Sequence, residues 1–433
     1  MEGKKILVLG MGLSGVSAAK FLLSKGAIVY GYDEKAFLVE GVLVADEALD
    51  LQEFDLVCVS PGISPKEKHY AKALELGIEI IGEVELGARF LKNPCIGITG
   101  TNGKTTVTLL VEHVLNCSGK KAVAVGNVGK PLTTYLLENP IDSDILVIEL
   151  SSYQIETLSH KIFDTAVILN ITPDHLDRYL NLNEYAKSKI KIMHCLKISN
   201  LIVHETCFDE FKDFFQSSNI QKFGYNLLSD LFTDLENVYF KGKFEYKLPV
   251  SMRGNFSYEI ENMMAAFALV KNFVTADQFL DGYLSFKKPP HRLEFVKQVN
   301  FVTYYDDSKG TNIDAVMKAV ANLRNPIYLI AGGVDKGASY EPWKQVFNGK
   351  VKAVFAIGQA ASKIKKELFP DIEVEIVETL ELAVKKAASV AVSGDSVLLS
   401  PGCSSFDMFK DYKDRGNAFK RCVNLLSKGN RNE

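Results

Sequence analysis

The sequence lacks the features that would place it in a membrane, in an oxidising compartment or on a nucleic acid. Its apolar runs, such as 6–9 and 145–148, are too short to cross a bilayer. The opening residues, MEGKKILVLG, contain too short an apolar stretch for a signal peptide. Seven cysteines lie far apart with no CxxC pair, which argues against disulfides or zinc and predicts a cytoplasmic protein. The formal net charge of -3 offers no basic surface for nucleic acid.

The composition is typical of a globular chain with more than one domain. At 433 residues the chain is too long for one ordinary core, and its 47% hydrophobic and 24% charged residues argue against disorder. We see no internal repeat and no low-complexity tract. Asn93-Pro94 and the stretch 287–290, KKPP, are plausible joints. The predicted domains are therefore 1–93, 94–290 and 291–433.

Short apolar runs alternate with helix-like stretches in each block, which predicts an α/β fold. The first and third blocks are expected to be Rossmann-like, and the middle block to resemble a P-loop ATPase domain. A helix is expected over 260–273, whereas 205–250 is less regular. The expected strands are 6–9, 28–32, 42–45, 56–59, 95–99, 122–125, 145–150, 166–171, 302–305, 327–331, 353–357, 374–377 and 397–399.

The run GITGTNGKTT at 97–106 joins an expected strand to an expected helix. Five residues separate Gly97 from Gly103, where a P-loop has four, yet the physical requirement is met. Glycines let backbone N–H groups face phosphate oxygens, and the helix presents its N-terminus to that charge. Lys104 can reach the β- and γ-phosphates, and the Thr105 hydroxyl can hold Mg²⁺. The run predicts an ATP site rather than an incidental turn, made of Gly100, Thr101, Asn102, Gly103, Lys104, Thr105 and Thr106.

A second glycine motif, GMGLSG at 10–15, follows the first strand, and Asp33 ends the next one. This is a dinucleotide fingerprint, but a full dinucleotide fold needs two mononucleotide halves, and the block ends near 93. A single half suits one nucleotide, such as a UDP group whose pyrophosphate lies on the turn. Ser60-Pro-Gly62 offers another phosphate-facing turn. The alternative is a tight turn that serves only helix–sheet packing.

Acidic and imidazole groups follow strands of the middle block. Glu149 ends the strand 145–150, and Asp174-His175 follow the strand 166–171. Ligands of open α/β sheets bind beyond the carboxyl ends of the strands, where the glycine loop also lies. A carboxylate and an imidazole there can hold a second metal ion. The alternative for His175 is a capping or packing role.

The third block offers polar loops after its strands. The run DDSKGTN at 306–312 ends a strand and opens a helix, which Asp307 or Asn312 can cap. The alternative is that a separate domain brings Arg292, Asp307 and Lys309 to the ATP. Donors fit for a carboxylate ligand lie in two further loops, 332–337 and 400–406.

Nearly the whole chain resembles the Mur ligases, the ATP-dependent amino-acid-adding enzymes of peptidoglycan synthesis. The motifs that carry the resemblance occur in order: TGTNGKTT, Glu149-Leu-Ser-Ser, Asp174-His-Leu-Asp-Arg178, His291-Arg292 and the DSKGTN run. The turn at 10–15, Ser60-Pro-Gly-Ile and SPGCSSFDMFKDYKDRG at 400–416 are similar to the members that add D-glutamate. The DNPR stretch of the diaminopimelate- or lysine-adding members is absent. In the segment that contacts the base, His-Asn-x-x-Asn in the family, only Asn262 matches.

The resemblance implies that the L-alanyl carboxylate of UDP-N-acetylmuramoyl-L-alanine attacks ATP, and that D-glutamate then attacks the acyl phosphate. It implies catalytic roles for Lys104, Glu149, His175, Lys189 and His291. Two Mg²⁺ ions would be held by Thr105, Glu149, His175 and a carbamate on Lys189. ATP would face Asn262, Arg292, Asp307 and Lys309. The UDP-sugar would contact Leu13, Ser14, Asp33, Ser60, Gly62 and Asn127, and D-glutamate would contact Thr311, Lys336, Ser405, Phe406 and Tyr412.

The expected partners are small molecules, with no nucleic acid or membrane, and the expected state is a monomer. A nicotinamide-dependent oxidoreductase would explain the turn at 10–15 but would leave the P-loop idle. A folylpolyglutamate-type ligase would explain the P-loop but not the N-terminal nucleotide block. A non-catalytic nucleotide-binding module is disfavoured because Lys104, Glu149, His175 and Lys189 are all present.

Overall fold

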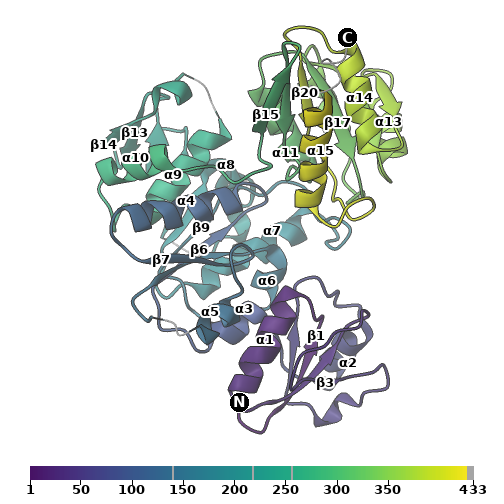
Figure 1. Cartoon of the computed structure of the whole chain (residues 1–433). Helices are drawn as coiled ribbons and strands as arrows, with labels where there is room; N and C mark the ends of the chain where they lie inside the picture. The colour runs from purple at the N-terminus through teal and green to yellow at the C-terminus, as the bar shows by residue number, and fades with distance from the viewer. Residues whose placement is uncertain (139–140, 217–218, 255–256, 427–433) are drawn as a thin grey trace. The chain divides into compact units, whose positions relative to one another are not determined.

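The structure is a computed structural model that describes residues 1–138, 141–216, 219–254 and 257–426 (Figure 1). The chain forms three β-sheets in sequence order. Its contacts divide it into two compact units, which we call the first unit (1–171 and 183–286) and the second unit (172–182 and the chain from 287 onward). The first two sheets belong to the first unit, and the third sheet belongs to the second unit.

The N-terminal sheet has five parallel strands in the order β3-β2-β1-β4-β5. Side chains of β1 alternate between two cores: Ile6 and Val8 pack on one face, and Leu7 and Leu9 on the other. Both faces are therefore covered, as parallel sheets require, with α1 on the Ile6 face (Figure 1). The elements are β1 (Lys5–Leu9), α1 (Leu13–Ser24), β2 (Ile28–Tyr32), β3 (Leu43–Val44), η1 (Leu51–Glu53), β4 (Leu56–Val59), α2 (Lys68–Leu76), β5 (Ile80–Gly82) and α3 (Glu83–Ala88).

The middle sheet has nine strands in the order β14-β13-β12-β11-β10-β9-β6-β8-β7. It is parallel apart from the β12–β13 and β13–β14 pairs. Its strands are β6 (Cys95–Thr99), β7 (Ala122–Gly126), β8 (Ile145–Glu149), β9 (Thr165–Ile168), β10 (Leu201–His204), β11 (Ile220–Gly224), β12 (Leu231–Thr233), β13 (Asn237–Phe240) and β14 (Lys243–Lys247). The stretch 205–250, which showed no regular pattern, thus holds four short strands.

The helices of this region are α4 (Lys104–Cys117), α5 (Leu132–Leu137), α6 (Ser152–Glu156), α7 (Leu182–Ile190), η2 (Lys191–Cys195), α8 (Glu205–Glu210), η3 (Lys212–Phe214), η4 (Val250–Met252), α9 (Tyr258–Val270) and α10 (Ala276–Ser285). The α4 helix, which follows the glycine loop, shares one apolar core with α9. Residues 260 and 262–270 of α9 are all buried, so this helix is enclosed by the fold and does not lie on its surface. The start of α4 is therefore held against a rigid interior.

The C-terminal sheet has six strands in the order β15-β16-β20-β17-β18-β19, and only the β15–β16 pair is antiparallel. Helices α11 to α13 pack on one face, and α14 and α15 pack on the other. The elements are β15 (Glu294–Val299), β16 (Val302–Asp306), α11 (Ile313–Asn322), β17 (Ile327–Gly332), α12 (Pro342–Phe347), β18 (Val351–Ile357), α13 (Ala361–Leu368), β19 (Val374–Ile376), α14 (Leu380–Val390), β20 (Ser396–Leu399) and α15 (Tyr412–Leu426).

The predicted α/β fold in three parts is confirmed, whereas the exact domain boundaries stay a prediction. The sequence did not reveal β5, β15 or the strands β10 to β14. Among the described residues, none of the helices combines the length and the apolar character needed to cross a membrane.

Candidate active site

The glycine loop between β6 and α4 is held from behind by Asn170. The Thr101 N–H donates to the Asn170 carbonyl at 2.8 Å, and the Asn102 N–H donates to Asn170 Oδ1 at 2.8 Å. The Asn170 amide donates back to the Asn102 carbonyl at 3.0 Å. Gly103 caps α4 with a φ of +88°, and a Cβ there would lie 2.5 Å from Asn262 Oδ1. The loop is therefore fixed, and Asn262 lies against it, while its contact with ATP stays a prediction.

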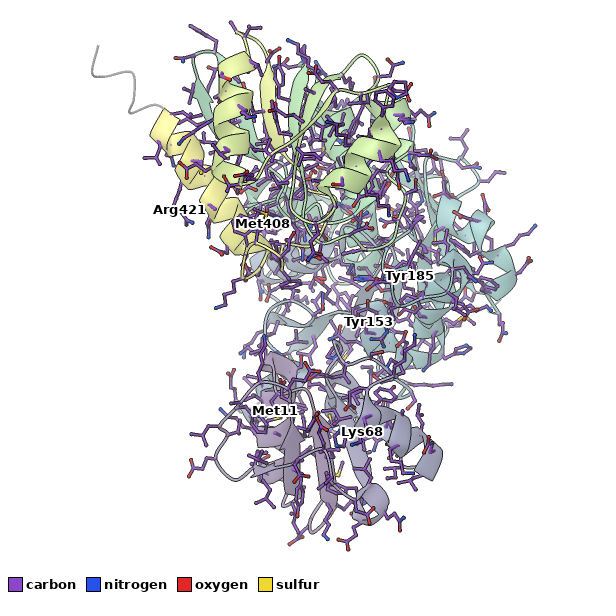
Figure 2. The ribbon with its side chains drawn as sticks, turned by 90° about the vertical axis from the view of Figure 1, so that its right-hand side faces the viewer. Met11, Lys68, Tyr153, Tyr185, Met408 and Arg421 are labelled. Atoms are coloured by element: carbon purple, nitrogen blue, oxygen red, sulfur yellow. The ribbon has the colours of Figure 1, made fainter. Side chains whose placement is uncertain are left out.

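Two lysine ammonium groups lie on one carbonyl of this loop. Lys104 Nζ donates to the Gly100 and Thr101 carbonyls at 2.9 and 2.8 Å. Lys189 Nζ donates to the same Gly100 carbonyl at 2.9 Å, and its side chain is only 1% exposed. Its ammonium also lies 4.6 Å from the ring centroid of Tyr185, which Figure 2 labels. Two ammonium groups that share one carbonyl acceptor repel each other. A bound polyanion would offset this repulsion, so the loop favours an anionic ligand.

Glu149 presents one satisfied and one open oxygen at the end of β8. The residue is 1% exposed, and its Oε1 accepts from the Asn127 amide at 2.7 Å. Its Oε2 is buried with no hydrogen-bond partner among the described residues. A buried carboxylate oxygen without a partner is costly unless a cation binds it. Oxygen is also the ligand that Mg²⁺ prefers, so Glu149 fits a magnesium site. Asn127, predicted to contact the UDP-sugar, here orients Glu149.

The N-terminal glycine turn has a packed face and an open face. Asp33 Oδ2 accepts the Met11 N–H at 2.6 Å, and the Ser60 hydroxyl donates to the Gly10 carbonyl at 2.7 Å. Met11 is labelled in Figure 2. A Cβ on Gly15 would lie 1.9 Å from the Gly10 oxygen, so this position admits only glycine. By contrast, a Cβ on Gly12 would meet nothing within 4 Å in the described chain. The predicted UDP-site residues Leu13, Ser14 and Gly62 are exposed or half-buried beside this turn.

In the second unit, Asp174 joins loops that the sequence did not connect. Its Oδ1 lies 3.0 Å from Lys336 Nζ, and its Oδ2 accepts from the Asn312 amide at 3.3 Å. Burial alone would raise the pKa of Asp174, but the charges of Lys336 and His175 outweigh it and hold this pKa below its ordinary value. Lys336, predicted to bind a D-glutamate carboxylate, thus already holds a carboxylate.

His175 has an unusual backbone conformation next to Asp174. Its φ is +56°, and its N–H donates to Asp174 Oδ1 at 2.9 Å. The ring Nε2 lies 3.7 Å from Asp174 Oδ2. A histidine with positive φ stores strain that is usual at functional sites. Of the predicted metal ligands, His175 belongs to the second unit, and the other three, Thr105, Glu149 and Lys189, belong to the first.

Asp307 is buried beside Ser400 in the loops after β16 and β20. Its Oδ2 accepts the Ser400 hydroxyl at 2.7 Å, and its Oδ1 accepts the Leu293 N–H at 3.1 Å. Burial raises the pKa of Asp307 to about 7, against the opposing effect of these bonds and of Arg292. Next to it, Lys309 Nζ lies 4.1 Å above the ring of Tyr412. The predicted ATP residues Arg292, Asp307 and Lys309 therefore lie close together within the second unit.

Sequence reasoning missed Arg415, which connects two of the predicted loops. It is 1% exposed, and it donates through Nε to the Ser308 hydroxyl at 3.0 Å. Its Nη2 donates to the Ser308 and Cys403 carbonyls at 2.9 and 3.1 Å. Burial lowers the pKa of Arg415 to about 10. The buried guanidinium thus holds the loop of Asp307 against the loop of Ser405 and Phe406. The only sequence signal was its place in the 400–416 motif.

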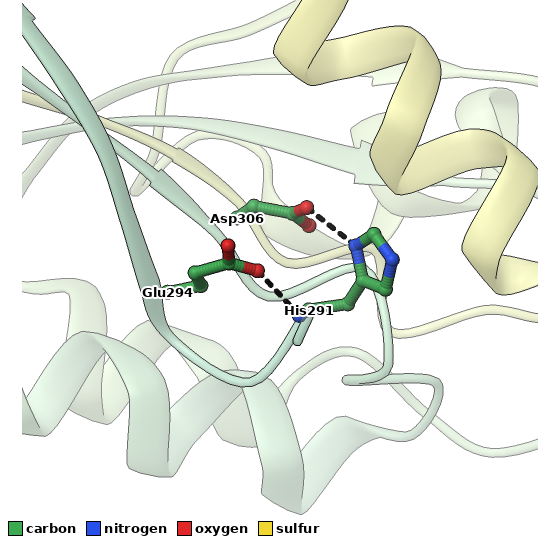
Figure 3. Close-up of side chains that lie close together, drawn as sticks. All are labelled: His291, Glu294 and Asp306. Atoms are coloured by element: carbon green, nitrogen blue, oxygen red, sulfur yellow. Dashed lines mark hydrogen bonds and ion pairs between the residues drawn. The ribbon is translucent and has the colours of Figure 1, made fainter. Parts of the chain in front are cut away.

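His291 lies at the centre of a polar cluster with Glu294 and Asp306, which Figure 3 shows. Its Nδ1 is 2.6 Å from Asp306 Oδ2, and its N–H donates to Glu294 Oε2 at 2.8 Å. The three residues were not connected by the sequence, because Asp306 lies 15 positions from His291 and on a different strand from Glu294.

Three family models match the chain in order along its length. They are the Mur ligase MurD-like N-terminal domain over residues 4–82, the Mur ligase middle domain over 98–270, and the Mur ligase glutamate ligase domain over 291–403. The chain belongs to the Mur ligase family. Within the middle-domain match, a lysine-bearing glycine loop lies at the start of α4.

Two relatives of this Mur ligase share the printed name UDP-N-acetylmuramoylalanine--D-glutamate ligase. The protein from Protochlamydia amoebophila is 48% identical over 98% of each chain. The protein from Caldicellulosiruptor saccharolyticus is 38% identical over 98% of this chain and 99% of its own. Both similarities extend across the glycine turn at 10–15, the glycine loop at 100–103 and the loops of the second unit.

Solved structures of other Mur ligases share the fold. UDP-N-acetylmuramate-alanine ligase from Thermotoga maritima superposes with a TM-score of 0.61 at 19% identity, over 98% of this chain and 99% of its own. MurF from Acinetobacter baumannii gives a TM-score of 0.63 at 18% identity, over 97% and 91% of the two chains. At these identities the likeness concerns the fold alone.

Proposed function

We propose that this Mur ligase uses ATP to join D-glutamate to UDP-N-acetylmuramoyl-L-alanine in peptidoglycan precursor synthesis. The observation that carries the proposal is the 48% identity over 98% of both chains to a relative with that printed activity. The two glycine turns agree with it, because a ligase of this kind must bind two phosphate-bearing substrates at once. A folylpolyglutamate-type ligase would leave the N-terminal turn without a ligand.

The reaction needs an activated carboxylate, because a carboxylate oxygen is a poor leaving group. The L-alanyl carboxylate attacks the γ-phosphate of ATP, and the amine of D-glutamate then displaces phosphate from the acyl phosphate. Lys104 would neutralise the phosphoryl group in transfer, and the N–H groups at the start of α4 would bind the phosphates. The protein supplies orientation and charge stabilisation rather than a nucleophile.

Thr105, Glu149, His175 and Lys189 are the groups we assign to two Mg²⁺ ions, which would supply charge neutralisation for the phosphates. The open Oε2 of Glu149 supports this assignment. Lys189 fits only after modification, since an ammonium repels a cation. A carbamate there would reverse its charge, relieve the repulsion from Lys104 and add two oxygen ligands. A ¹³C NMR signal from ¹³C-bicarbonate that is present in the native chain and absent from Lys189→Gln would identify the carbamate.

We place the other two substrates beside the remaining predicted residues. The UDP group would lie on the open face of the 10–15 turn, in contact with Leu13, Ser14, Asp33, Ser60, Gly62 and Asn127. D-Glutamate would lie among Thr311, Lys336, Ser405, Phe406 and Tyr412, where Lys336 would exchange the Asp174 carboxylate for one from the substrate. We further propose a cytoplasmic monomer with no nucleic-acid or membrane partner, divided at 93 and 290.

The test is phosphate release from ATP with UDP-N-acetylmuramoyl-L-alanine and a panel of D- and L-amino acids. We expect release with D-glutamate and little with L-glutamate, D-aspartate or L-lysine. Release with L-lysine or diaminopimelate in place of D-glutamate would assign a different amino acid. Release with folate and L-glutamate, but not with the UDP substrate, would move the chain to the other class of ligase.

A further inference from the structure

His291 is held in one orientation by the carboxylate of Asp306. The ring lies in a residue with a φ of +64° that is 4% exposed, and its Nδ1 is 2.6 Å from Asp306 Oδ2 (Figure 3). Asp306 itself is fully buried, and its Oδ1 accepts the Ser308 N–H at 2.9 Å. A carboxylate accepts hydrogen bonds, so the Nδ1 must carry the hydrogen. In the neutral ring, Nε2 is then the nitrogen that can take up a proton.

Charged groups surround the ring. Glu294 Oε2 accepts the His291 N–H and lies 2.6 Å from Lys420 Nζ, which is also 3.7 Å from Asp306 Oδ2. With a neutral His291, two carboxylates face one ammonium, and the net charge of the cluster is about -1. A proton taken up at Nε2 would bring this charge to zero.

Other titratable groups surround this cluster from neighbouring elements. Asp307 follows Asp306 directly, and Arg415 on α15 interacts electrostatically with both carboxylates. The ring of Tyr412 lies edge-on to the His291 ring at 6.1 Å between centroids. The Lys309 N–H donates to the His291 carbonyl at 3.1 Å. The cluster therefore borders the groups that we assign to ATP and D-glutamate in the second unit.

A metal ion is the other possible occupant, because ligand atoms of His291, Glu294 and Asp306 lie within 4.8 Å of one another. The Lys420 ammonium argues against it. Its Nζ already lies against Glu294 and near Asp306, where it would repel a divalent ion at close range. The cluster therefore suits a proton on His291 better than a divalent metal ion.

We propose that His291 accepts the proton released by the amine of D-glutamate, and that Asp306 is the positioning residue that orients it. This inference rests on the proposed ligase function. The ammonium R′–NH₃⁺ gives one proton to Nε2 and becomes a nucleophile. Its nitrogen forms the amide bond as the C–O bond to phosphate breaks, and the second proton leaves with the phosphate as HPO₄²⁻. His291 then returns its proton to solvent, so atoms and charges balance.

The first test observes the ring itself and needs no ligase activity. ¹⁵N–¹H NMR of ¹⁵N-histidine-labelled full-length chain, assigned with His291→Gln, reports which nitrogen carries the hydrogen and at which pH the ring charges. We expect the Nδ1–H tautomer in the native chain. Asp306→Asn should weaken this preference, because the carboxylate that accepts the Nδ1 hydrogen is removed. An Nε2–H tautomer in the native chain would overturn the proposal, even if every variant failed to fold.

Glu294→Gln is the matched control, because it changes the cluster by the same single charge but leaves the Asp306 contact in place. We expect it to keep the Nδ1–H tautomer, whereas Asp306→Asn should lose that preference. Asp395→Asn, a buried carboxylate paired with Lys352 elsewhere on the third sheet, controls for lost stability. If Asp306→Asn and Glu294→Gln had equal effects on the His291 ring, Asp306 would contribute only its charge. Its assignment as the positioning residue would then be wrong.

The second test measures turnover against pH. His291→Gln should lower kcat by about 10²–10⁴-fold, with the KM values of ATP and the UDP substrate nearly unchanged. Asp306→Asn should change the acid limb of the kcat profile, because the orientation and tautomer of the ring are no longer fixed. A kcat profile that Asp306→Asn leaves in place would contradict the inference. If the native chain released no phosphate with D-glutamate, the proposed function would fail while the tautomer result still stood.

Discussion

The two glycine turns of the first unit both connect a strand to a helix, but they carry opposite charge. Each follows a parallel strand and begins a helix at a glycine cap without a side-chain hydrogen bond, at Gly12 for α1 and Gly103 for α4. Both therefore leave helix N–H groups available to an anion. The first turn is held from behind by the carboxylate of Asp33, whereas the second carries the ammonium groups of Lys104 and Lys189.

This difference separates a site that holds a phosphate from a site that transfers one. Hydrogen bonds and shape are sufficient to bind a pyrophosphate that stays intact. A phosphoryl group in transfer develops charge that positioned cations must stabilise. We therefore propose that the unreactive UDP group binds the turn at 10–15 and that ATP binds the loop at 100–103. The predictions below test this division.

The largest effect should come from Lys104→Ala. We expect ATP turnover to fall by about 10²–10³-fold or more, since an electrostatic contact to the transferring group is lost. Affinity for the UDP substrate, measured by calorimetry, should stay nearly unchanged, because that binding rests on the other turn. Lys120→Ala, at an exposed position beyond the same helix, serves as the control. A parallel loss of UDP-substrate affinity would remove the division between the two turns.

The next largest effects should distinguish Gly12 from Gly15. A methyl group at Gly12 meets nothing in the described chain and would occupy the proposed phosphate position, so Gly12→Ala should weaken UDP-substrate binding by about tenfold or more while Tm is kept. Gly15→Ala would place its Cβ against the Gly10 carbonyl and should lower Tm. Normal UDP-substrate affinity in Gly12→Ala would show that the phosphate lies elsewhere.

A smaller effect should appear in thermal protection by nucleotides. UDP should raise Tm of the native chain, and NAD at the same concentration should not, because ligands stabilise only the fold that binds them. Asp33→Asn should reduce the protection by UDP, since it weakens the bond to the Met11 N–H. Protection by NAD but not by UDP would reinstate the dinucleotide reading of the 10–15 motif.

The smallest effect should be the pH dependence that Asp307 gives to stability. Burial raises the pKa of Asp307 from 3.8 to about 7, so between these values the folded chain binds more protons than the unfolded chain. Its contribution to the free energy of unfolding is therefore full below pH 4 and decreases as the pH rises toward 7. Asp307→Asn should flatten this slope in urea titrations at pH 5 and pH 8. An unchanged slope would mean that Asp307 ionises normally.

The sequence predicted the parts of the fold that local pattern determines. Strands such as β1 and β8 are short continuous apolar runs, and both glycine motifs follow them directly. The edge strands β14 and β15 were missed, because they mix charged and apolar residues on half-exposed surfaces. The sequence also gave no role to Asn170, Asp306 or Arg415, and it did not connect Asp174 with Lys336. Each of these acts through contacts with residues distant in the sequence, and no local spacing reports such contacts.

The central claim is that ATP activates the substrate carboxylate as an acyl phosphate, and it can be tested by following one oxygen atom. UDP-N-acetylmuramoyl-L-alanine labelled with ¹⁸O in its carboxylate would be turned over with ATP and D-glutamate, and the released phosphate analysed by mass spectrometry. An acyl phosphate requires one ¹⁸O atom in each phosphate, released together with ADP. Unlabelled phosphate, or AMP with pyrophosphate, would contradict the account.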